Sequence, residues 1–429
     1  MAKMKDSGIK WIGDIPEDWN LTKLKYICSN ITDGSHFSPE TKNGGKTYVT
    51  VTNVNNDFID FENAPKISEY DFKILEKNGC KPKTGDVLLA KDGTVGRTAI
   101  VKENDYVVLS SLAILTPNNT ITSSFLKYSL DGDYLQKQMQ LSMAGSALRR
   151  ITIGKINKYK TILPPLETQK LIVNFLDSKC TKINALKIDI QKQIETLEQY
   201  KKSVITEAVT KGINPDAKMK DSGIEWIGEI PEHWETKRGK YIFTQRNDKG
   251  NNIELQLLSP TQKYGVIPQV MYDEISGMNS VKLKENTDFN LLKTCHKGDF
   301  CISLRSFQGG FEYSKYEGVV SPAYQIFYPT IKIADGYYKY LFKEKNFIEK
   351  INSFTLSLRD GKPISYFDFS NMYLPLPSAK EQKQIADYLD AKCSKIDSII
   401  ATKKQQLETL EEYKKSLIFE YVTGKKEVQ

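Results

Sequence analysis

Two stretches of the chain place apolar residues at the spacing of a long coiled coil. In the first stretch apolar side chains recur every seven residues, with others between them: Leu176, Ile183, Ile190, Leu197 and Val204, interleaved with Ile172, Leu186 and Ile194. The second stretch repeats the series at Leu389, Ile396, Lys403, Leu410 and Leu417, interleaved with Ile385, Ile399 and Leu407. A seam that persists for about four heptads predicts two helices of about 40 residues, each roughly 60 Å long.

The simplest arrangement packs the two helices on each other as an antiparallel pair between two globular domains, because one helix closes each half of the chain. Lys403 interrupts the second seam where Ile190 stands in the first, as a polar residue that sets the register would. The alternative is that each helix is amphipathic and packs only on its own domain. Matched length and matched sequence favour the helix pair.

The segments before the two helices read as mixed and strand-rich. Short apolar or β-branched runs at residues 46–54, 86–90 and 105–116 are typical of strands, and Gly, Asn and Asp clusters separate them. Prolines at positions 164–165, 375 and 377 end these segments, because proline cannot continue a helix backwards into the residue that precedes it.

The chain is one unit written twice. The sequence MKDSGIKWIGDIPEDW at residues 4–19 recurs as MKDSGIEWIGEIPEHW at 219–234, and the helical segment 175–212 recurs at 388–425. A period of about half the chain indicates a duplicated domain rather than a solenoid of short repeats. The stretches between the repeats, about 20–162 and 235–373, do not align beyond scattered matches, which suggests two sites that do the same job on different targets.

These patterns together predict an α+β fold with an internal pseudo-two-fold duplication. Two globular domains are joined by two long helices that pack as an antiparallel coiled coil. We expect domain boundaries at 1–162, 163–214, 215–373 and 374–429, which alternate a globular domain with a helical spacer. A chain of 429 residues is long enough for two such cores.

Composition adds little to the function. The formal net charge is +8, which fits a nucleic-acid partner without requiring one. Six cysteines are scattered without a CxxC pair, and no signal peptide or apolar run of membrane-spanning length is visible, so we expect free thiols in a cytoplasmic protein.

Signatures of catalysis fail one by one. Residues 43–47 resemble the end of a phosphate-binding P-loop, but Glu40 stands where the motif needs glycine. Residues 321–324 (SPAY) resemble the motif with which amino-methyltransferases hold a flipped base, without its second proline and without a cofactor loop. With three histidines and dispersed cysteines, a zinc site is not expected. A binding protein is favoured over an enzyme, with no catalytic residue, metal or cofactor of its own.

The chain resembles the specificity subunits of type I restriction–modification systems over essentially its whole length. The resemblance rests on the doubled WIGxIPxxW element, a diverged domain, a Leu-Pro then Gln-Lys start of the helix, and a long helix that ends near Val-Thr and a glycine. Further points of similarity are the segments TDGSH at 32–36, GDVLL at 85–89 with Gly93, Gly96 and Arg97, GS at 145–146 followed by Arg149, and GDFCI at 298–302 with Arg305, Gly309 and Gly310. The second half lacks an equivalent of the DGSH segment.

This resemblance implies two target recognition domains, each of which reads one half of a split double-stranded DNA site. The paired helices would act as a ruler between the half-sites and as the docking surface for two methyltransferase subunits. Those subunits would bind S-adenosylmethionine, while ATP-driven motor–nuclease subunits would carry out cleavage. Major-groove faces recur about 34–36 Å apart, and a rod of roughly 60 Å can span that distance.

Base readout needs Arg, Lys, Asn or Gln side chains on loops. The predicted DNA-binding residues of the first half are Ser35, His36, Lys42, Lys46, Lys91, Arg97, Arg149 and Arg150, with Asn53 nearby in sequence. Those of the second half are Arg246, Gln262, Lys263, Tyr264, Arg305, Gln308 and Arg359. For each residue the alternative is a solvated charge or a phosphate contact. Arg97 and Arg305 rank first because they follow similar GD segments.

Two other repeated features have structural interpretations. Lys201–Lys202 and Lys414–Lys415 recur in both helices and are expected to be solvated coiled-coil positions, with spacer phosphates as the alternative contact. The tryptophans at 11, 19, 226 and 234 are expected to pack each domain against its helix.

Two other functions stay open. A stand-alone DNA-binding regulator would need no methyltransferase partner. A structural adaptor would use the rod and the inserts to bind proteins rather than DNA.

Overall fold

The structure is a computed structural model that describes residues 3–37, 39–41, 44–55, 58–143, 150–249, 255–277, 291–303, 310–334, 336–354 and 364–428. Its internal contacts divide the chain into two compact units. The first unit comprises Met1–Gln191 and Lys404–Gln429, and the second comprises Lys192–Lys403. Each unit therefore contains one globular part and one half of each long helix. The domain boundaries expected from the sequence, which separate the helices from the globular parts, stay a prediction.

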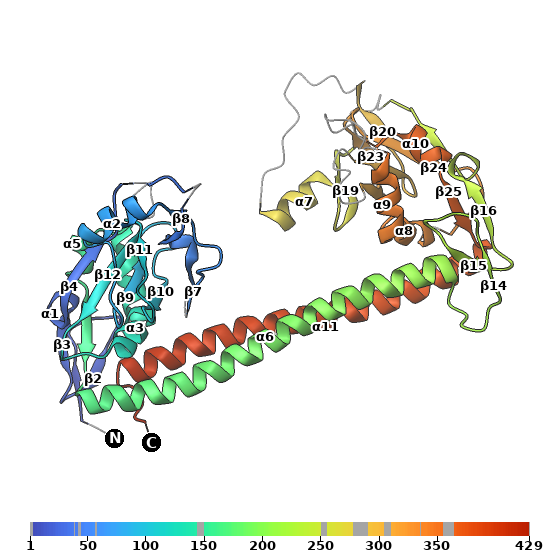
Figure 1. Ribbon diagram of the computed structural model, residues 1–429. Helices are drawn as coiled ribbons and strands as arrows, with labels where there is room; N and C mark the ends of the chain where they lie inside the picture. Colours follow the sequence, from blue (N-terminus) through green and yellow to red (C-terminus); the bar gives the residue numbers. More distant parts are fainter. Residues whose placement is uncertain are drawn as a thin grey trace. The chain divides into compact units, whose positions relative to one another are not determined.

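The first half of the chain consists of short strands and helices that precede one long helix (Figure 1). The elements are β1 Met4–Asp6, β2 Asp14–Pro16, β3 Asn20–Lys23, α1 Leu24–Ile27, β4 Cys28–Asp33, β5 Lys46–Val49, η1 Val51–Asn53, β6 Val54–Asn55, β7 Phe58–Ile59, β8 Lys66–Ile67, α2 Glu69–Lys77, β9 Val87–Ala90, β10 Thr98–Ile100, β11 Tyr106–Val108, β12 Leu112–Pro117, α3 Ser123–Asp131, α4 Asp133–Met143, α5 Ile153–Ile156, β13 Lys160–Leu163 and α6 Leu166–Lys211.

The second half of the chain follows the same plan. Its elements are β14 Met219–Asp221, β15 Glu229–Pro231, β16 Glu235–Arg238, η2 Gly239–Tyr241, β17 Phe243–Arg246, β18 Leu258–Thr261, β19 Gly265–Pro268, α7 Gln269–Ser276, β20 Lys293–Cys295, β21 Phe300–Ile302, β22 Phe311–Tyr313, β23 Gly318–Val320, β24 Gln325–Pro329, α8 Tyr337–Leu341, α9 Lys345–Ser353, α10 Tyr366–Asn371, β25 Tyr373–Leu376 and α11 Ala379–Val422.

The two units share one sheet topology although their sequences diverge. The strand order is β10-β9-β12-β4 in the first unit and β22-β21-β24-β17 in the second, with every neighbouring pair antiparallel. A smaller sheet, β13-β3 or β25-β16, pairs the strand before each long helix with the strand after the repeated tryptophan, in equivalent register. The predicted α+β class and the predicted duplication are therefore confirmed.

The strands of the first unit are apolar without alternation because both faces of the sheet are covered. All four residues of β9 are buried. Val87 and Leu89 belong to the core that also contains helix α3 and the start of α6, whereas Leu88 and Ala90 belong to a second core against β6 and β11. Side chains alternate between the two faces of a strand, so a continuous apolar run is what a doubly covered strand requires.

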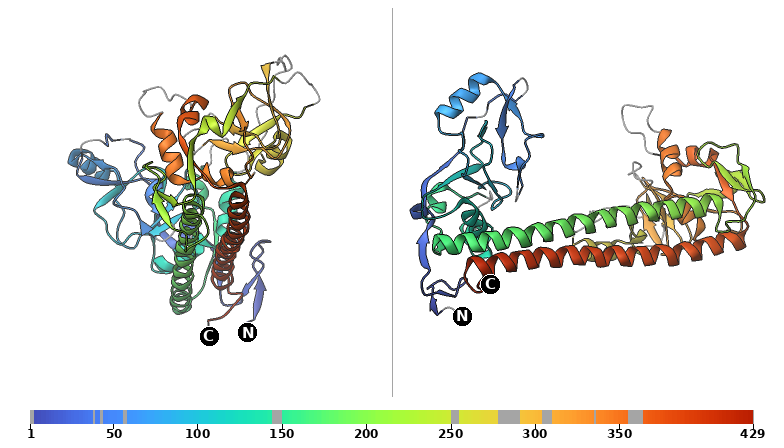
Figure 2. Two further views of the ribbon diagram at one scale, coloured as in Figure 1. Left: turned by 90° about the vertical axis from the view of Figure 1, so that its right-hand side faces the viewer. Right: turned by 60° about the horizontal axis from the view of Figure 1, so that its bottom comes forward.

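The long helices pair with each other, as the heptads predict. In the first unit Leu176 and Ile183 of α6 share a core with Leu417 and Val422 of α11. In the second unit Val204 and Ala208 of α6 share a core with Ile385 and Leu389 of α11. The start of each helix meets the end of the other, so the pair is antiparallel, and Figures 1 and 2 show the helices side by side.

Polar contacts across the helix pair repeat with the same offset as the sequence. Lys201 donates to Asp397 at 2.7 and 2.6 Å in the second unit, and Lys414 donates to Asn184 at 3.0 Å in the first. Lys201 and Lys414 are equivalent in the repeat, as are Asn184 and Asp397. The predicted register-setting Lys403 donates to Gln193 on the other helix.

Part of the predicted seam is wrong. Leu186 and Ile399, which the heptad pattern places between seam positions, are exposed on the surface of the helix pair. The tryptophan prediction is wrong at one position as well. Trp19, Trp226 and Trp234 are buried in the two cores, but Trp11 is 37% exposed.

Each long helix is anchored at its start by a buried glutamine and at its end by a glycine. The Gln169 amide donates to the carbonyls of Thr120 and Pro164, both at 2.9 Å, and Gln382 donates in the same way to Pro377 at 2.9 Å. The glycines after the helices have positive φ, and a side chain there would approach Trp234 in the second unit and Trp19 in the first. Within the described residues, no helix is both long and apolar enough to cross a membrane.

Candidate nucleic-acid interface

The Gly-Asp segment that both halves share builds a turn at the start of a central strand. Asp86 accepts a hydrogen bond from the backbone N–H of Lys83 at 2.7 Å, and Asp299 accepts one from His296 at 2.8 Å. Both aspartates are buried, and the glycine before each has a positive φ, 90° and 96°. The segment is therefore structural. It forms the turn from which β9 and β21 begin.

In the first unit, backbone hydrogen bonds hold several predicted DNA-binding loops together at one end of the sheet. The N–H of Ser110 donates to the carbonyl of Ser35 at 2.9 Å, and the N–H of Lys91 donates to Ser111 at 2.9 Å. The N–H of Ile151 in turn donates to Lys91 at 2.9 Å. The loop after β4, the β9–β10 turn and the segment at Arg150 thus form one edge.

Two predicted residues of this edge are engaged inside the domain. The Lys91 side chain is 3% exposed, and its ammonium group lies 3.3 Å from Asp33. The Ser35 hydroxyl donates to the carbonyl of Phe37 at 3.0 Å and accepts from its N–H at 2.8 Å. Lys91 and Ser35 therefore stabilise the loop. A buried charge needs a partner of opposite charge, and the Ser35 hydroxyl is already hydrogen-bonded to the backbone of Phe37.

Other predicted residues of the first unit are at the surface. The His36 ring is 70% exposed and lies 3.6 Å from Asp33. Arg150 is exposed, with Nε 2.9 Å from Asp92 Oδ1. Lys46 lies away from this edge on β5, 3.3 Å from Asp105.

Arg97 faces a polar hollow of about 290 Å³. Its walls come from the β9–β10 turn, α3, α4 and α11: Val95, Gly96, Arg97, Asp131, Asp133, Gln136, Gln140, Glu411, Lys414, Lys415 and Ile418. Gln136 fixes the turn by donating to the carbonyl of Gly96 at 2.9 Å and to that of Leu130 at 2.8 Å. The backbone at position 96 has a φ of 97°, a conformation that favours glycine, and the Gln136 amide packs against the space that a side chain would occupy. Arg97 is therefore presented from a rigid turn beside Lys414 and Lys415.

In the second unit Arg246 is a structural residue. Its guanidinium donates to both oxygens of Asp299, at 2.8 and 3.2 Å, and to Asp248 at 2.9 Å. It also lies 4.2 Å from the centroid of the Tyr328 ring. A guanidinium held in this way by a buried carboxylate stabilises the domain rather than being presented to a ligand.

The predicted residues Gln262, Lys263 and Tyr264 form the tip of the β18–β19 hairpin. All three are exposed, and the Lys263 ammonium lies 4.9 Å from the centroid of the Tyr264 ring. The pKa of Lys263 is raised, first by its hydrogen bond with Tyr264 and also by the negative charge of Asp397 on α11. An amide, a cation and an aromatic ring at one exposed tip can contact bases and phosphates.

The remaining predicted DNA-binding residues lie outside the described residues: Lys42, Arg149, Arg305, Gln308 and Arg359. Sequence reasoning missed Gln136, which holds the Arg97 turn, because a single glutamine on a helix carries no recognisable signal. It also missed the repeated exposed tyrosines Tyr26 and Tyr241, although the alignment of the two halves displays them. Among the residues that the structure describes, no group of His, Cys, Asp and Glu is arranged to hold a metal ion.

Comparison with known proteins identifies relatives over the whole chain. A family model described as the type I restriction modification DNA specificity domain matches residues 16–196 and again residues 227–411. The putative type I restriction enzyme MjaX specificity subunit of Methanocaldococcus jannaschii is 27% identical over 431 residues, which cover 96% of this chain and 95% of that protein. The MjaVIII specificity subunit of the same organism is 24% identical, with 96% and 93% covered.

Solved structures show the same fold. A chain from a structure that describes complex assembly and conformational transition of the type I R-M system aligns with a TM-score of 0.67 and 15% identity, covering 96% of this chain and 99% of that one. The HsdS subunit from Thermoanaerobacter tengcongensis aligns with a TM-score of 0.50 and 16% identity, covering 96% and 98%.

Proposed function

This chain belongs to the type I restriction–modification DNA specificity family, and from that premise we propose that each of its two units reads one half of a bipartite DNA site. The observation that carries the proposal is the repetition of one sheet topology with different loops. A shared frame gives both units the same way of approaching DNA, and different loops give them different bases to read.

The candidate reading groups differ between the units. In the first unit they are His36, Arg97 and Arg150, and in the second they are the hairpin-tip residues Gln262–Tyr264. Arginine reads guanine through two acceptors in the major groove, and glutamine reads adenine. Lys414 and Lys415, beside Arg97, supply positive charge for the phosphates of the same DNA segment.

The paired helices are proposed as the docking surface for two methyltransferase subunits. Exposed apolar side chains occur at equivalent positions of the two helices: Leu186 and Ile399, and Tyr200 and Tyr413. The first unit thus displays Leu186 with Tyr413, and the second unit displays Ile399 with Tyr200. Solvent-exposed apolar residues that recur on both helices are typical of a protein interface.

The subunit is proposed to be non-catalytic. Methyl transfer with S-adenosylmethionine and ATP-driven cleavage would belong to the partner subunits, and this chain would bring them to their DNA site without a cofactor of its own.

The test is to co-express the chain with the methyltransferase subunit encoded beside it and to map adenine methylation by long-read sequencing. We expect a motif with two defined halves around a fixed unread gap. Arg97→Ala should relax one position in one half, and Gln262→Ala should relax one position in the other half, because each lost base contact removes about 1–3 kcal/mol of discrimination. The control Lys77→Ala, on the exposed surface of α2, should leave the motif unchanged.

Two other results would support the alternatives. Purification of a DNA-binding chain that captures no methyltransferase partner would favour a regulator. An absence of salt-dependent DNA binding in the intact complex would favour an adaptor, because phosphate contacts make affinity fall steeply with salt.

A further inference from the structure

The repeated frame displays a lysine–tyrosine pair at the same place in both units. Tyr26 and Tyr241 follow the strands β3 and β16, and their side chains are 62% and 61% exposed. The ammonium group of Lys25 lies 4.5 Å from the Tyr26 ring centroid, and that of Lys240 lies 5.3 Å from the Tyr241 ring centroid. An aromatic ring that is exposed at equivalent positions of both units marks a candidate interaction site, because it recurs with the frame rather than occurring singly.

The surroundings of the two pairs share a basic residue at the end of the preceding strand, Lys23 or Arg238, but differ in the residue opposite it. Lys23, next to the first pair, is opposite Lys160 in the β3–β13 ladder, and Arg238, next to the second, is opposite Tyr373 in the β16–β25 ladder. Both neighbourhoods are basic.

The lysine–tyrosine pair of the first unit lies at the opposite end of the sheet from the candidate DNA-reading loops. Tyr26 comes just before β4 begins at Cys28, whereas His36 comes just after β4 ends at Asp33. Six residues of strand separate these ends by roughly 20 Å. Asn118, at the far end of β12, donates to the carbonyl of Tyr26 at 3.0 Å and fixes that position.

In the second unit the lysine–tyrosine pair lies at the opposite end of the sheet from the end of β21. Tyr241 precedes β17, and the N–H of Thr330, after β24, donates to the carbonyl of Ile242 at 2.8 Å. Strand β21, which corresponds to the strand before the Arg97 turn, ends at Ile302 opposite Gln325, at the other end of the sheet.

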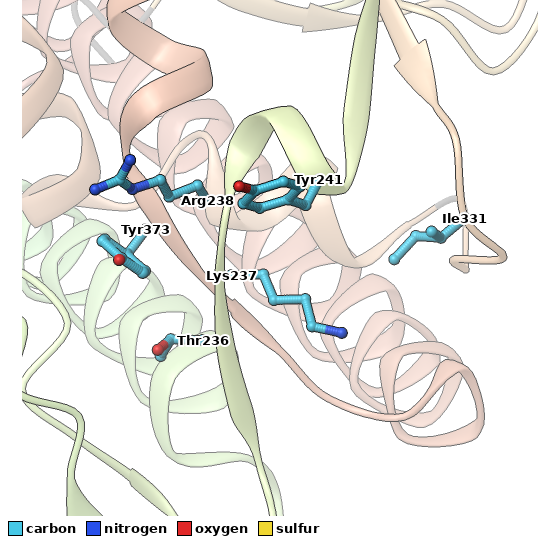
Figure 3. A pocket seen from close by; sticks show the side chains of 6 residues that line it. All are labelled: Thr236, Lys237, Arg238, Tyr241, Ile331 and Tyr373. Carbon is cyan, nitrogen blue, oxygen red and sulfur yellow. The ribbon is translucent and has the colours of Figure 1, made fainter.

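The second unit also has a hollow beside its tyrosine. The hollow has a volume of about 510 Å³ and is lined by Thr236, Lys237, Arg238, Tyr241, Ile331 and Tyr373. Figure 3 shows Arg238 next to Tyr373, and Lys237 and Tyr241 on the side of Ile331. The Arg238 guanidinium lies 5.3 Å from the Tyr373 ring centroid. This is a basic, aromatic-lined surface that suits an acidic protein segment with an apolar side chain.

We infer that the Lys25–Tyr26 and Lys240–Tyr241 surfaces are a second docking site for the modification (methyltransferase) subunit, with one copy on each unit. The inference rests on the proposed function. The DNA half-sites differ between the units, whereas the modification subunit is the same protein in both places. The lysine–tyrosine pair is the same in both units, whereas the reading loops differ. It therefore suits the partner that is the same in both places, which is the modification subunit.

Photo-cross-linking in the intact complex tests the contact directly. A benzophenone amino acid would replace Tyr26 or Tyr241 in the full chain co-expressed with its modification subunit, and Tyr70, an exposed tyrosine on α2, would serve as the control position. We expect cross-links to the modification subunit from positions 26 and 241 and none from position 70. Cross-links from 26 and 241 to DNA instead would overturn the inference.

Truncation provides a second measurement. Tyr26→Ala and Tyr241→Ala should each weaken binding of one modification subunit by about 30-fold, as loss of a central aromatic contact does, while Tyr70→Ala should not. Native mass spectrometry at limiting concentration would show complexes with one modification subunit in place of two.

The outcomes separate this inference from the proposed function. If the wild-type chain directs methylation at a bipartite motif and both alanine variants bind two modification subunits with unchanged affinity, the inference is wrong and the proposed function stands. If the wild-type chain captures no modification subunit, both are wrong.

Discussion

At the residue scale, the predicted DNA-binding cations fall into two groups, those paired with a carboxylate inside their domain and those exposed to solvent. Lys91 and Arg246 are paired with Asp33 and Asp299 inside their domains, whereas Lys263 and Arg150 are exposed. The division follows from desolvation, because a cation taken out of water is stable only beside a carboxylate, and such a cation is not available to a phosphate or a base.

This division predicts opposite effects for two substitutions in the second unit. Arg246→Leu should lower the free energy of unfolding by about 3 kcal/mol, because it leaves the buried Asp299 carboxylate without its partner. Lys263→Ala should leave the stability within about 0.5 kcal/mol of wild type but weaken DNA binding and reduce its salt dependence. Urea denaturation and DNA titrations at several salt concentrations measure both. Equal stability of the two variants would contradict the structural role of Arg246.

At the scale of elements, the helix pair is held by an apolar seam and by polar contacts that the duplication has left unequal. The Lys201–Asp397 pair carries two charges, but its equivalent, Lys414–Asn184, carries one. Asn184→Asp should therefore stabilise the helix pair and Asp397→Asn should destabilise it, each by up to about 1 kcal/mol because the pairs lie at the surface.

Thermal denaturation at low and high salt checks this prediction, since screening should reduce both effects. Asp216→Asn, in the exposed segment after α6, is the matched control and should change nothing. A stability that does not respond to Asn184→Asp at low salt would show that the contact contributes no electrostatic energy.

The helix pair should also weaken in acid. The pKa of Glu411 is lowered from its ordinary 4.5, mainly by the hydrogen bond from Lys187 on α6. A carboxylate with a lowered folded-state pKa contributes stability above its unfolded-state pKa, and that contribution is lost as the pH falls through the folded-state pKa. Glu411→Gln should therefore lower stability at pH 7 slightly and flatten its dependence on pH below about 4.5. An unchanged pH profile would contradict this assignment.

At the scale of the whole molecule, we propose that the helix pair also acts as a ruler that fixes the gap between the two half-sites, as the family resemblance implies. Seven residues added to both helices, in the turns that contain Gln193 and Lys403, keep the heptad seam and lengthen the pair by roughly 10 Å. We expect the unread gap in the methylated motif to grow by about three base pairs at 3.4 Å each. Seven residues added to α6 alone should abolish methylation, because the seam loses its register. A gap that stays constant when both helices are lengthened would refute the ruler.

The sequence by itself determined the duplication, the two long helices and the family resemblance. These features are periodic or repeated, so the spacing of residues along the chain carries them without any knowledge of contacts. The central strands were predictable as well, because a strand covered on both faces needs a continuous apolar run, as in β9.

Only the tertiary structure decided which predicted residues are available to a ligand. The sequence gives no reason to treat Lys91 and Lys263 differently. Lys91 is buried and paired because Asp33, which is distant in sequence, lies next to it in the folded chain. The same holds for Trp11, Leu186 and Ile399, whose exposure depends on what the rest of the chain covers. Whether a side chain is buried or paired depends on contacts between segments that are distant in sequence. A local sequence pattern carries no information about those contacts.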